Sequence, residues 1–357
     1  MKFSICIPNY NYERYIGAAI QSVFDQTHRD FEICVADNAS TDRSVEIVKG
    51  FDPSRIKLRI NRCNVGFAGN LDKAASLADG DRMILLSSDD LLMPDALASY
   101  AAVDAAMGDA GSRAILNSTC HVIDSDGNVT GHEPLVRKML GGAVRDEALT
   151  KVAGADVLRI DAGRLLSNSL ALLRTPLKFL TTCYPRTIYE AVEGYANGRL
   201  INPDKYFSWK IMAAADEVIF IDRPLFSYRV HANNQGAIQA RLGALKHLSD
   251  QYLSTFDLPD AVMARSGLDR DRLASAFIEQ DIGLRGLHLL ATGRRSEAKR
   301  GIAFGYAAYP RLMRGNRKVM ALRTLLAAGP IGEATAKRLH ARALAQWNTS
   351  LETAAQT

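Results

Sequence analysis

Short apolar runs alternate with helical patterns over the first 100 residues of the chain. Runs such as FSICIP and FEICVA have the length and composition of buried strands. Between them, apolar residues recur at three- and four-residue spacing, which is typical of amphipathic helices. This alternation predicts an α/β fold with a mostly parallel sheet, right-handed crossovers and flanking helices. The predicted strands are residues 3–8, 31–36, 56–60 and 82–86, and the predicted helices are residues 15–23, 45–48 and 69–78.

Beyond about residue 240 the pattern is helical throughout. Pro310 and Pro330, with glycines nearby, divide this region into segments. We therefore predict an α/β domain over residues 1–238, a helical C-terminal region over 239–347 and a flexible tail over 348–357. The helices predicted in the C-terminal region are residues 241–253, 272–291, 296–309, 318–328 and 333–347.

Unusual polar residues follow three of the predicted strands. Residues 9–11 are Asn-Tyr-Asn, residues 37–38 are Asp-Asn and residues 87–90 are Ser-Ser-Asp-Asp. Because ligands of open parallel sheets bind outside the carboxyl ends of the strands, we expect these segments to meet in one crevice. The first turn lacks the glycines of the GxGxxG fingerprint, so a nicotinamide-dependent dehydrogenase is disfavoured.

The adjacent carboxylates Asp89 and Asp90 are candidate metal ligands. Two like charges at a partly enclosed strand end repel each other, and a divalent cation would relieve that repulsion. Carboxylate oxygens suit Mg²⁺ or Mn²⁺, which often bind one or two carboxylates together with substrate phosphates. The alternative is that the pair merely caps the helix that begins near residue 95.

The charge is distributed unevenly along the chain. The net charge is +5, but residues 285–342 contain thirteen Lys and Arg and only two acids, Glu297 and Glu333. That segment carries +11, so the rest of the chain sums to −6. A basic region after a mildly acidic body indicates a polyanionic partner, either anionic lipid headgroups or nucleic acid. A simply solvated basic face is the alternative.

Composition excludes several classes of protein. With 47% hydrophobic and 23% charged residues, the chain has enough apolar material for a large core. The five cysteines are scattered without CxxC spacing, which disfavours a zinc site or a disulfide framework. The first residues do not resemble a signal peptide, and no apolar run is long enough to span a bilayer. We therefore expect a cytoplasmic protein.

Two stretches carry a family resemblance. NYNYERYIGAAIQSVFDQTHRDFEICVADNASTD and NRCNVGFAGNLDKAASLADGDRMILLSSDDLLMPD resemble the opening blocks of the family 2 glycosyltransferases, and the similarity resumes at about residues 184–236. The resemblance implies the GT-A fold, in which residues 1–100 would bind the nucleotide and residues 101–238 the acceptor. It also implies a nucleoside diphosphate sugar as donor and Mg²⁺ or Mn²⁺ as cofactor.

The resemblance assigns roles to residues of the first half. Asp37 would recognise the nucleotide base, and the loop of Pro8, Tyr10 and Asn11 would pack on the nucleoside. Asn70 lies in the block before the fourth strand and is assigned to the same nucleotide site. Asp89 and Asp90 resemble the DxD pair that holds the metal and the diphosphate or ribose, although Ser87 replaces the first Asp of the usual Asp-Ser-Asp-Asp.

In the second half, Asp204 resembles the general base of inverting transferases. Pro203 stands where a Glu is usual, and an N-cap role for Asp204 is the alternative. His231 resembles the C-terminal histidine that joins the metal or the diphosphate, and a hydrogen-bonded structural histidine is the alternative. Arg229 is assigned to the same phosphates, with a solvated or salt-bridged arginine as the alternative. Arg186 and Trp209 are candidates for the acceptor side, with a core position as the alternative for Trp209.

Together these features predict a metal-dependent inverting glycosyltransferase of bacterial surface polysaccharide synthesis. We expect a UDP-sugar donor and a glycan or lipid-linked acceptor, with the basic helices on the anionic inner face of the cytoplasmic membrane and no nucleic acid bound. One alternative is a non-catalytic binder with a nucleotide-binding-like head and a basic surface. A sugar nucleotidyltransferase is another, but it would need a glycine-rich and basic phosphate loop after the first strand, which residues 8–11 do not provide.

Overall fold

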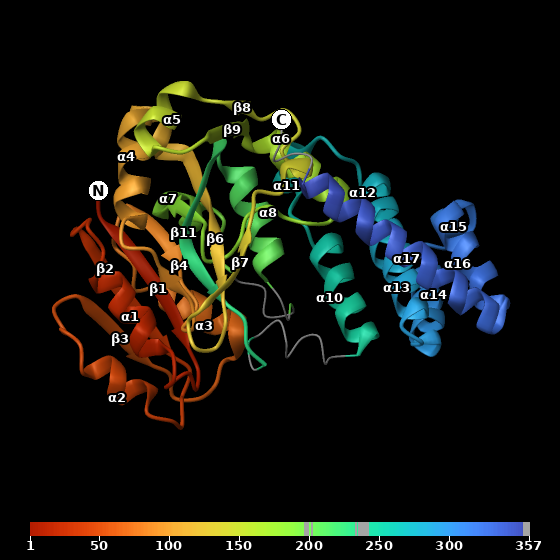
Figure 1. Ribbon diagram of the computed structural model, residues 1–357, viewed down its shortest axis with the longest axis horizontal. Helices are drawn as coiled ribbons and strands as arrows, with labels where there is room; N and C mark the ends of the chain where they lie inside the picture. Colours follow the sequence, from red (N-terminus) through yellow and green to blue (C-terminus); the bar gives the residue numbers. More distant parts are fainter. Residues whose placement is uncertain (196–199, 201–202, 233, 235–242, 353–357) are drawn as a thin grey trace. The chain divides into compact units, whose positions relative to one another are not determined.

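The computed structural model describes residues 1–195, 200, 203–232, 234 and 243–352. The chain forms two compact units (Figure 1). The sheet unit comprises Met1–Leu135, Gly142–Leu166 and Thr175–Ala232. The helical unit comprises Val136–Gly141, Ser167–Arg174 and Asn233–Thr357.

One large mixed sheet organises the sheet unit. Its strands lie in the order β3-β2-β1-β4-β10-β6-β11-β9-β8, with β5 paired to β11 and β7 paired to β6. The strands are β1 (Phe3–Asn9), β2 (Phe31–Asp37), β3 (Ile56–Ile60), β4 (Arg82–Leu85), β5 (Leu91–Leu92), β6 (Ala114–Ile123), β7 (Val129–Glu133), β8 (Val144–Arg145), β9 (Val157–Asp161), β10 (Cys183–Pro185) and β11 (Glu217–Arg229).

The first four strands are parallel and confirm the α/β prediction. β1 lies between β2 and β4, and β2 pairs with β3, all in parallel register. β10 is antiparallel to both β4 and β6, and it joins this parallel block to a second part of the sheet in which β6 and β11 are parallel. The predicted strands agree with β1 to β4 to within one residue at each end.

Helices flank the sheet because their apolar faces pack against its apolar residues. In α1, the residues Ile16, Ala19, Ile20 and Val23 are fully buried, and their spacing places them on one side of the helix. They join the alternate apolar residues of β1 in the hydrophobic core. The helices of this part of the chain are α1 (Ile16–Phe24), α2 (Ser44–Lys49), α3 (Gly66–Ala75), α4 (Ala96–Met107), η1 (Gly108–Arg113), α5 (Glu147–Ala153), α6 (Ala162–Leu172), α7 (Arg186–Ala191) and α8 (Asp204–Ala214).

The end of β11 pairs with β5, so it brings residues near position 229 beside the Asp89–Asp90 pair. The first part of β11, Glu217–Ile221, pairs antiparallel with β9. The register against β6 then shifts at Pro224, whose ring cannot donate a ladder hydrogen bond. After the shift, Phe226 and Ser227 pair with β5, which directly follows the Asp89–Asp90 pair. The end of β11 therefore lies against the loop that leaves β4.

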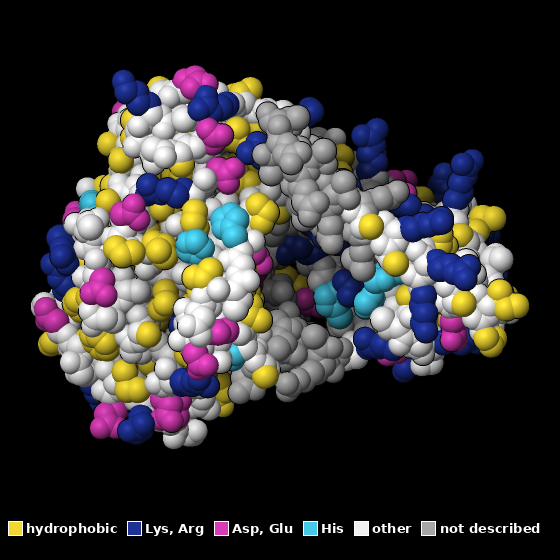
Figure 2. All heavy atoms as spheres, in the orientation of Figure 1, with side chains coloured by type: hydrophobic (Ala, Val, Ile, Leu, Met, Phe, Trp, Pro, Cys, Tyr) yellow, Lys and Arg dark blue, Asp and Glu magenta, His cyan; other side chains and the backbone are white. Residues whose placement is uncertain are grey.

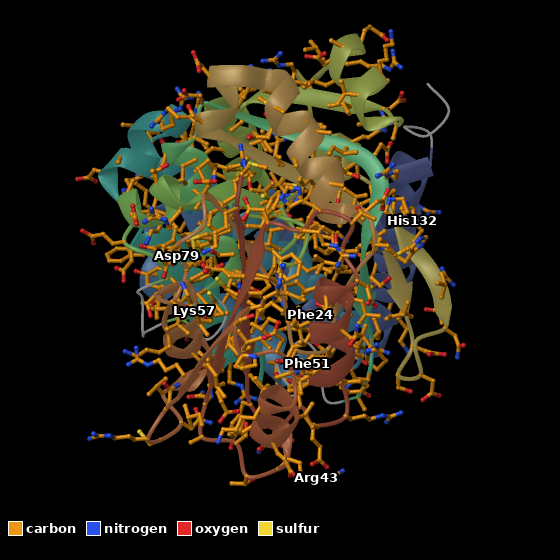
Figure 3. All side chains as sticks on the ribbon, turned by 90° about the vertical axis from the view of Figure 1, so that its left-hand side faces the viewer. Phe24, Arg43, Phe51, Lys57, Asp79 and His132 are labelled. Carbon is orange, nitrogen blue, oxygen red and sulfur yellow. The ribbon has the colours of Figure 1, made fainter. Side chains whose placement is uncertain are left out.

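A charge cluster lies at the amino ends of the parallel strands. Lys2 Nζ and Lys57 Nζ lie 2.7 Å and 2.9 Å from Glu32 Oε2. Both lysines also pair with Asp79, and Figure 3 shows Lys57 and Asp79 lying side by side. Glu32 Oε1 accepts hydrogen bonds from the Ser4 hydroxyl and the Asp79 peptide N–H. The cluster, which we call the amino-end cluster (Lys2, Glu32, Lys57 and Asp79), is internally neutral and well hydrogen-bonded.

The helical unit confirms a helical C-terminal region but with other boundaries. The helix predicted over 272–291 is one continuous segment whose middle is π-helical, and a short helix at Asp260–Ser266 was not predicted. Residues 241–242 of the first predicted helix lie outside the described residues. The elements are η2 (Arg137–Met139), α10 (Ala244–Phe256), α11 (Asp260–Ser266), α12 (Arg270–Phe277), η3 (Ile278–Leu284), α13 (Arg285–Ala291), α14 (Arg295–Ala308), α15 (Pro310–Gly315), α16 (Arg317–Ala327) and α17 (Gly329–Glu352).

The final helix is longer than its sequence pattern indicates. α17 begins four residues before the predicted start and continues to Glu352, and residues 353–357 lie outside the described part of the chain. Among the described residues, none of the helices combines the length and apolar character required to cross a bilayer.

Candidate functional site

Asp37 lies at the carboxyl end of β2, directly beside Asn9 at the end of β1. The Asn9 amide donates to Asp37 Oδ1 at 2.8 Å, while the Ser40 hydroxyl and peptide N–H donate to Oδ1 at 2.6 Å and Oδ2 at 2.9 Å. A carboxylate offers about four acceptor positions, so roughly one remains on the almost fully buried Asp37. That remaining position would suit a ligand N–H.

The loop after β1 is held in place by the loop after β2. Asn11 adopts a left-handed backbone with φ 57°, which its short polar side chain tolerates. Its peptide N–H donates to Ser40 Oγ at 2.9 Å, and its side-chain oxygen accepts from the Thr41 peptide at 2.8 Å. Pro8 O accepts from the Ser88 hydroxyl at 3.0 Å. The Tyr10 ring is left 44% exposed, so it is available to a ligand.

Asn70 lies beneath this loop rather than on its surface. Its amide nitrogen donates to the backbone oxygens of Asn9 and Ala36, at 3.2 Å and 2.9 Å, and its oxygen accepts from Asn61 at 2.9 Å. The side chain is buried, and its predicted contact with the nucleotide stays a prediction. Asn70 therefore fixes the spacing of the first two strand ends, which is a positioning role not foreseen from the sequence.

Asp89 and His231 meet after β4 and β11. Asp89 Oδ2 lies 2.9 Å from His231 Nε2. The histidine ring packs beside Tyr15 and Tyr12, with centroid separations of 4.9 Å and 6.0 Å. Burial raises the pKa of Asp89, and the hydrogen bond from His231 opposes that shift. An acidic oxygen and an imidazole nitrogen are thus placed together, with two tyrosine rings beside the imidazole.

Asp90 points into the protein. Its Oδ1 accepts from the Arg229 peptide N–H at 2.8 Å, and the side chain is almost fully buried. Burial, and then the charge of Asp89, raise the pKa of Asp90 well above its ordinary value. The contacts of Asp90 tie the loop after β4 to β11, whereas Asp89 faces the histidine.

A divalent cation fits this arrangement through two protein ligands. Within the described parts of the chain, no three His, Cys, Asp or Glu side chains are grouped as a metal site. Asp89 and His231 nevertheless supply an oxygen and a nitrogen at one point. Mg²⁺ commonly binds through few protein groups and completes its shell with substrate phosphates and water. Asp89 and His231 would therefore hold the ion, and the predicted metal contact of Asp90 stays a prediction.

The guanidinium group of Arg229 donates hydrogen bonds to backbone oxygens of the protein. Its Nε donates to Asp89 O at 2.8 Å and its Nη1 to Asp124 O at 2.9 Å. The guanidinium also lies 4.9 Å from the centroid of the Tyr15 ring. These contacts connect the Asp89 loop to the β6–β7 turn. The predicted phosphate contact of Arg229 stays a prediction, and the contacts in the structure point to a positioning role.

Asp204 is the first residue of α8, and its carboxyl group is poorly solvated. Its Oδ1 atom is buried and has no hydrogen-bond partner among the described residues. Burial raises the pKa of Asp204 to about 7. A carboxyl group with this pKa exchanges a proton near neutral pH, which suits a general base.

The pKa of the Tyr228 phenol is affected by carboxylates from both halves of the site. Burial raises the pKa of its phenol, and the charges of Asp90, Asp89 and Asp204 raise it further. The phenol of Tyr228 therefore lies within electrostatic reach of all three carboxylates. The sequence reasoning missed Tyr228, Tyr12 and Tyr15, although each lies within four residues of a predicted site residue.

The two acceptor-side candidates are Arg186, which lies at the far end of β4, and Trp209, which lies in the core. Arg186 Nε donates to Gly80 O at 3.2 Å, just before β4 begins, so it lies at the opposite end of this strand from Asp89. Trp209 is fully buried, as its core alternative predicts.

Comparison with known proteins supports this reading of the chain. Residues 4–106 match the Glycosyl transferase family 2. The abequosyltransferase RfbV of Salmonella typhimurium is 38% identical over 103 residues, which are 28% of this chain and 31% of the relative. The UDP-Glc:alpha-D-GlcNAc-diphosphoundecaprenol beta-1,3-glucosyltransferase WfgD of Escherichia coli is 39% identical over 94 residues, 26% of this chain and 37% of the relative. The matches thus span about a third of the length of these relatives.

Solved structures extend the likeness in fold to nearly the whole chain. S. aureus TarS 1–349 in complex with UDP-GlcNAc aligns with a TM-score of 0.63 and 17% identity, covering 97% of this chain and 92% of that one. The mannosyltransferase PcManGT of Pyrobaculum calidifontis, in complex with GDP-Man and Mn²⁺, aligns with a TM-score of 0.50 and 15% identity, covering 98% of this chain and 86% of that one. Residues 4–106 are thus similar to the Glycosyl transferase family 2, and the fold of the whole chain is that of these solved glycosyltransferases, the GT-A fold.

Proposed function

We propose that this protein transfers a sugar from a UDP-sugar to a hydroxyl group of a glycan or lipid-linked acceptor in bacterial surface polysaccharide synthesis. The observation that carries the proposal is the meeting of Asp89 and His231, 2.9 Å apart, beyond the end of the parallel strand β4, in the same sheet whose β2 ends in Asp37. The UDP-GlcNAc bound by TarS and the UDP-Glc donor in the name of WfgD support the choice of nucleotide. We place the reaction in the cytoplasm, beside the inner face of the cytoplasmic membrane.

The donor nucleotide would bind over the ends of β1 and β2. Asp37 keeps about one acceptor position, which would receive an N–H of the base. The exposed Tyr10 ring would stack on the base, while Pro8 and Asn11 would fix the shape of the loop beneath it. Asn70 would contribute by holding the two strand ends at their present spacing.

Transfer would then be a single displacement. The acceptor oxygen forms a bond to the anomeric carbon while Asp204 takes the hydroxyl proton. The bond from that carbon to the diphosphate oxygen breaks, and its electron pair leaves with the nucleoside diphosphate. Attack opposite the leaving group inverts the anomeric centre. Asp89 and His231 would hold Mg²⁺ or Mn²⁺, which when bound offsets the negative charge of the diphosphate.

A thermal-shift experiment tests the donor and the metal together. We expect UDP-sugars with Mn²⁺ to raise the Tm more than GDP- or TDP-sugars, because a ligand that binds only the folded state stabilises it. Asp89→Asn should lose the part of the shift that depends on Mn²⁺. Asp216→Asn, at an exposed aspartate just after α8, is the matched control and should keep it. A protein that responds to no nucleotide sugar and transfers no sugar in a radiolabel assay would refute the proposal.

A further inference from the structure

The helical unit ends in a hairpin of α16 and α17 whose turn is unusually tight. Gly329 has φ 59°, a left-handed conformation that favours glycine. A Cβ atom on Gly332 would lie 1.8 Å from Leu325 O, so only glycine fits at that close approach. Because Gly332 faces α16, its neighbour Ile331 is turned outward, and 77% of Ile331 is exposed. The turn therefore presents a large apolar side chain to the surroundings.

The inward and outward faces of α17 differ sharply. Ala336 is fully buried, and His340 Nε2 lies 3.0 Å from His288 Nδ1 of α13. On the other side of the helix, exposed residues recur at a spacing of three or four, so they lie on one face. We call it the outer face of α17: Ile331, Thr335, Arg338, Leu339 and Arg342.

Chemically, the outer face combines apolar groups with arginines. Leu339 is 41% exposed, and the Thr335 hydroxyl is satisfied by Ile331 O at 2.9 Å, which leaves its methyl group free to make apolar contacts. Arg338 and Arg342 form no ion pair among the described residues. A helix face of this composition is typical of segments that lie in a membrane interface.

Acidic residues do not neutralise the surrounding surface. The two acids of residues 285–342 are already engaged, Glu297 with Arg294 and Glu333 with Arg295. Arg295 also donates to Leu326 O at 2.5 Å, which brings a further arginine beside the turn. Figure 2 shows Lys and Arg side chains spread over the helical unit. Glu279 and Asp281, just before this segment, also pair with Lys318 and Arg285. Residues 279–342 still have thirteen Lys and Arg against four acids, and this excess of +9 is available to an anionic partner.

We infer that the outer face of α17 and the Ile331 turn dock on an anionic lipid bilayer. The apolar side chains would enter the boundary between headgroups and acyl chains, and the arginines would contact the lipid phosphates. Charge complementarity favours anionic lipid over an uncharged apolar partner, because the uncharged partner would leave the arginines without counterions. This inference does not depend on the proposed sugar transfer, since lipid binding can be measured without any donor.

Vesicle co-sedimentation of the full chain tests the docking surface. We expect binding to vesicles of phosphatidylcholine with phosphatidylglycerol, weakened by salt, and little binding to pure phosphatidylcholine. Ile331→Asp should weaken binding about tenfold because it removes the inserted side chain and adds a like charge. Arg338→Gln and Arg342→Gln should each weaken it about fivefold.

Matched variants of the sheet unit provide the controls. Val129→Asp changes a 63% exposed valine of β7 to the same charged residue, and the double change Arg59→Gln with Arg62→Gln removes two exposed arginines. Both should bind vesicles as the unaltered protein does. Circular dichroism should show that all the variants keep their helix content, because the substituted side chains are exposed.

Three results would overturn the inference. The first is equal binding by the unaltered protein and Ile331→Asp. The second is a loss of binding in Val129→Asp as large as that in Ile331→Asp, which would show a general effect of charge. The third is a dimer in light scattering that Ile331→Asp dissociates, because the turn would then be a contact between two copies of this chain.

Discussion

Two carboxylate clusters lie at opposite ends of the same parallel strands, and their surroundings are opposite. At the amino ends, Glu32 and Asp79 are each paired with two lysines. Beyond the carboxyl ends, no lysine or arginine forms an ion pair with Asp89, Asp90 or Asp204 in the described part of the chain. Carboxylates at the amino ends are thus paired with lysines, whereas at the other end Asp89 is paired with His231, and Arg229 donates to the backbone oxygen of Asp89.

The pKa directions follow from this difference. At the amino ends, burial would raise the pKa of Glu32, but hydrogen bonds from Asp79, Lys2 and other groups lower it, and Lys2 and then Lys57 lower the pKa of Asp79. At the other end, burial raises the pKa of Asp89, Asp90 and Asp204. The amino-end cluster therefore favours folding, whereas burial of the carboxylates at the other end costs folding free energy and suits a cationic or proton-bearing ligand.

The largest expected effect is on catalysis beyond the carboxyl ends. Asp204→Asn should lower the rate of sugar transfer by about 10²–10⁴-fold, because the acceptor proton would have no base. Affinity for the nucleotide sugar should stay within about twofold, since Asp204 serves the acceptor. Steady-state kinetics with donor titration measures both, and Asp216→Asn is the control. An Asp204→Asn enzyme with full activity would show that this carboxyl group is only structural.

The next effect is on folding at the amino ends. Glu32→Gln should lower the free energy of unfolding by about 2 kcal/mol, because two lysines lose the buried carboxylate they share. Urea denaturation measures the change, and Glu46→Gln on the exposed side of α2 should change stability by less than about 0.5 kcal/mol. Transfer activity of the folded Glu32→Gln protein should be unchanged. A loss of activity without a loss of stability would contradict the assignment of this cluster to structure.

The two ends should also respond to pH with opposite signs. The folded-state pKa of Asp204, about 7, lies above its ordinary value, so stability is lost as pH rises from about 4 to 7. Asp204→Asn removes this loss and should stabilise the protein by about 1–2 kcal/mol at pH 8 but hardly at all at pH 4. Thermal unfolding at the two pH values measures the difference.

Glu32 provides the opposite case in the same experiment. Its pKa is lowered in the folded state, so its contribution is complete above the ordinary carboxyl pKa and is lost as pH falls through the lowered value. The stabilising effect of Asp204→Asn should therefore grow with pH, and so should the destabilising effect of Glu32→Gln. A Tm difference for Asp204→Asn that does not vary with pH would show that its carboxyl group titrates normally.

The smallest expected effect is at the rim of the amino-end cluster. The Asp79 side chain is 60% exposed, so solvent screens its pairs with the lysines. Asp79→Asn should cost about 0.5 kcal/mol, well below the effect of Glu32→Gln. Urea denaturation of the two variants side by side checks the order. If Asp79→Asn were the more costly of the two, burial would not be what distinguishes members of this cluster.

The sequence predicted β1, β2 and β4 because they are apolar runs that end at a turn, and β3 because its apolar residues alternate with charges. It predicted none of the strands from β5 to β11. Of these, β7, β8 and β9 are short and carry exposed or charged residues, so periodicity does not distinguish them from loops. The sequence predicted the longer helices of the helical unit with shifted ends, and it did not predict the short helices α11 and α15. Pro330 reads as a break between helices, yet it lies inside the first turn of α17, where proline is tolerated.

The candidate site was predictable where strand ends define it. The placement of Asp37 and Asp89 at the carboxyl ends of β2 and β4 follows from the alternation alone. Whether a polar side chain faces a ligand or the protein depends on tertiary packing, which a single sequence does not reveal. Asn70 and Arg229 therefore matched the family pattern while their contacts in the structure are with the protein.

The position of β10 bears on how the protein can be divided. The region that matches the family stops at residue 106, but one edge of β4 is covered by β10, which comes almost 80 residues later in the chain. A fragment cut at that point would leave the hydrogen-bonding groups of β4 bare, and such an edge recruits other strands and promotes aggregation. The nucleotide half should therefore be expressed together with β10, and no single cut separates the two units, because the helical unit includes Val136–Gly141 and Ser167–Arg174.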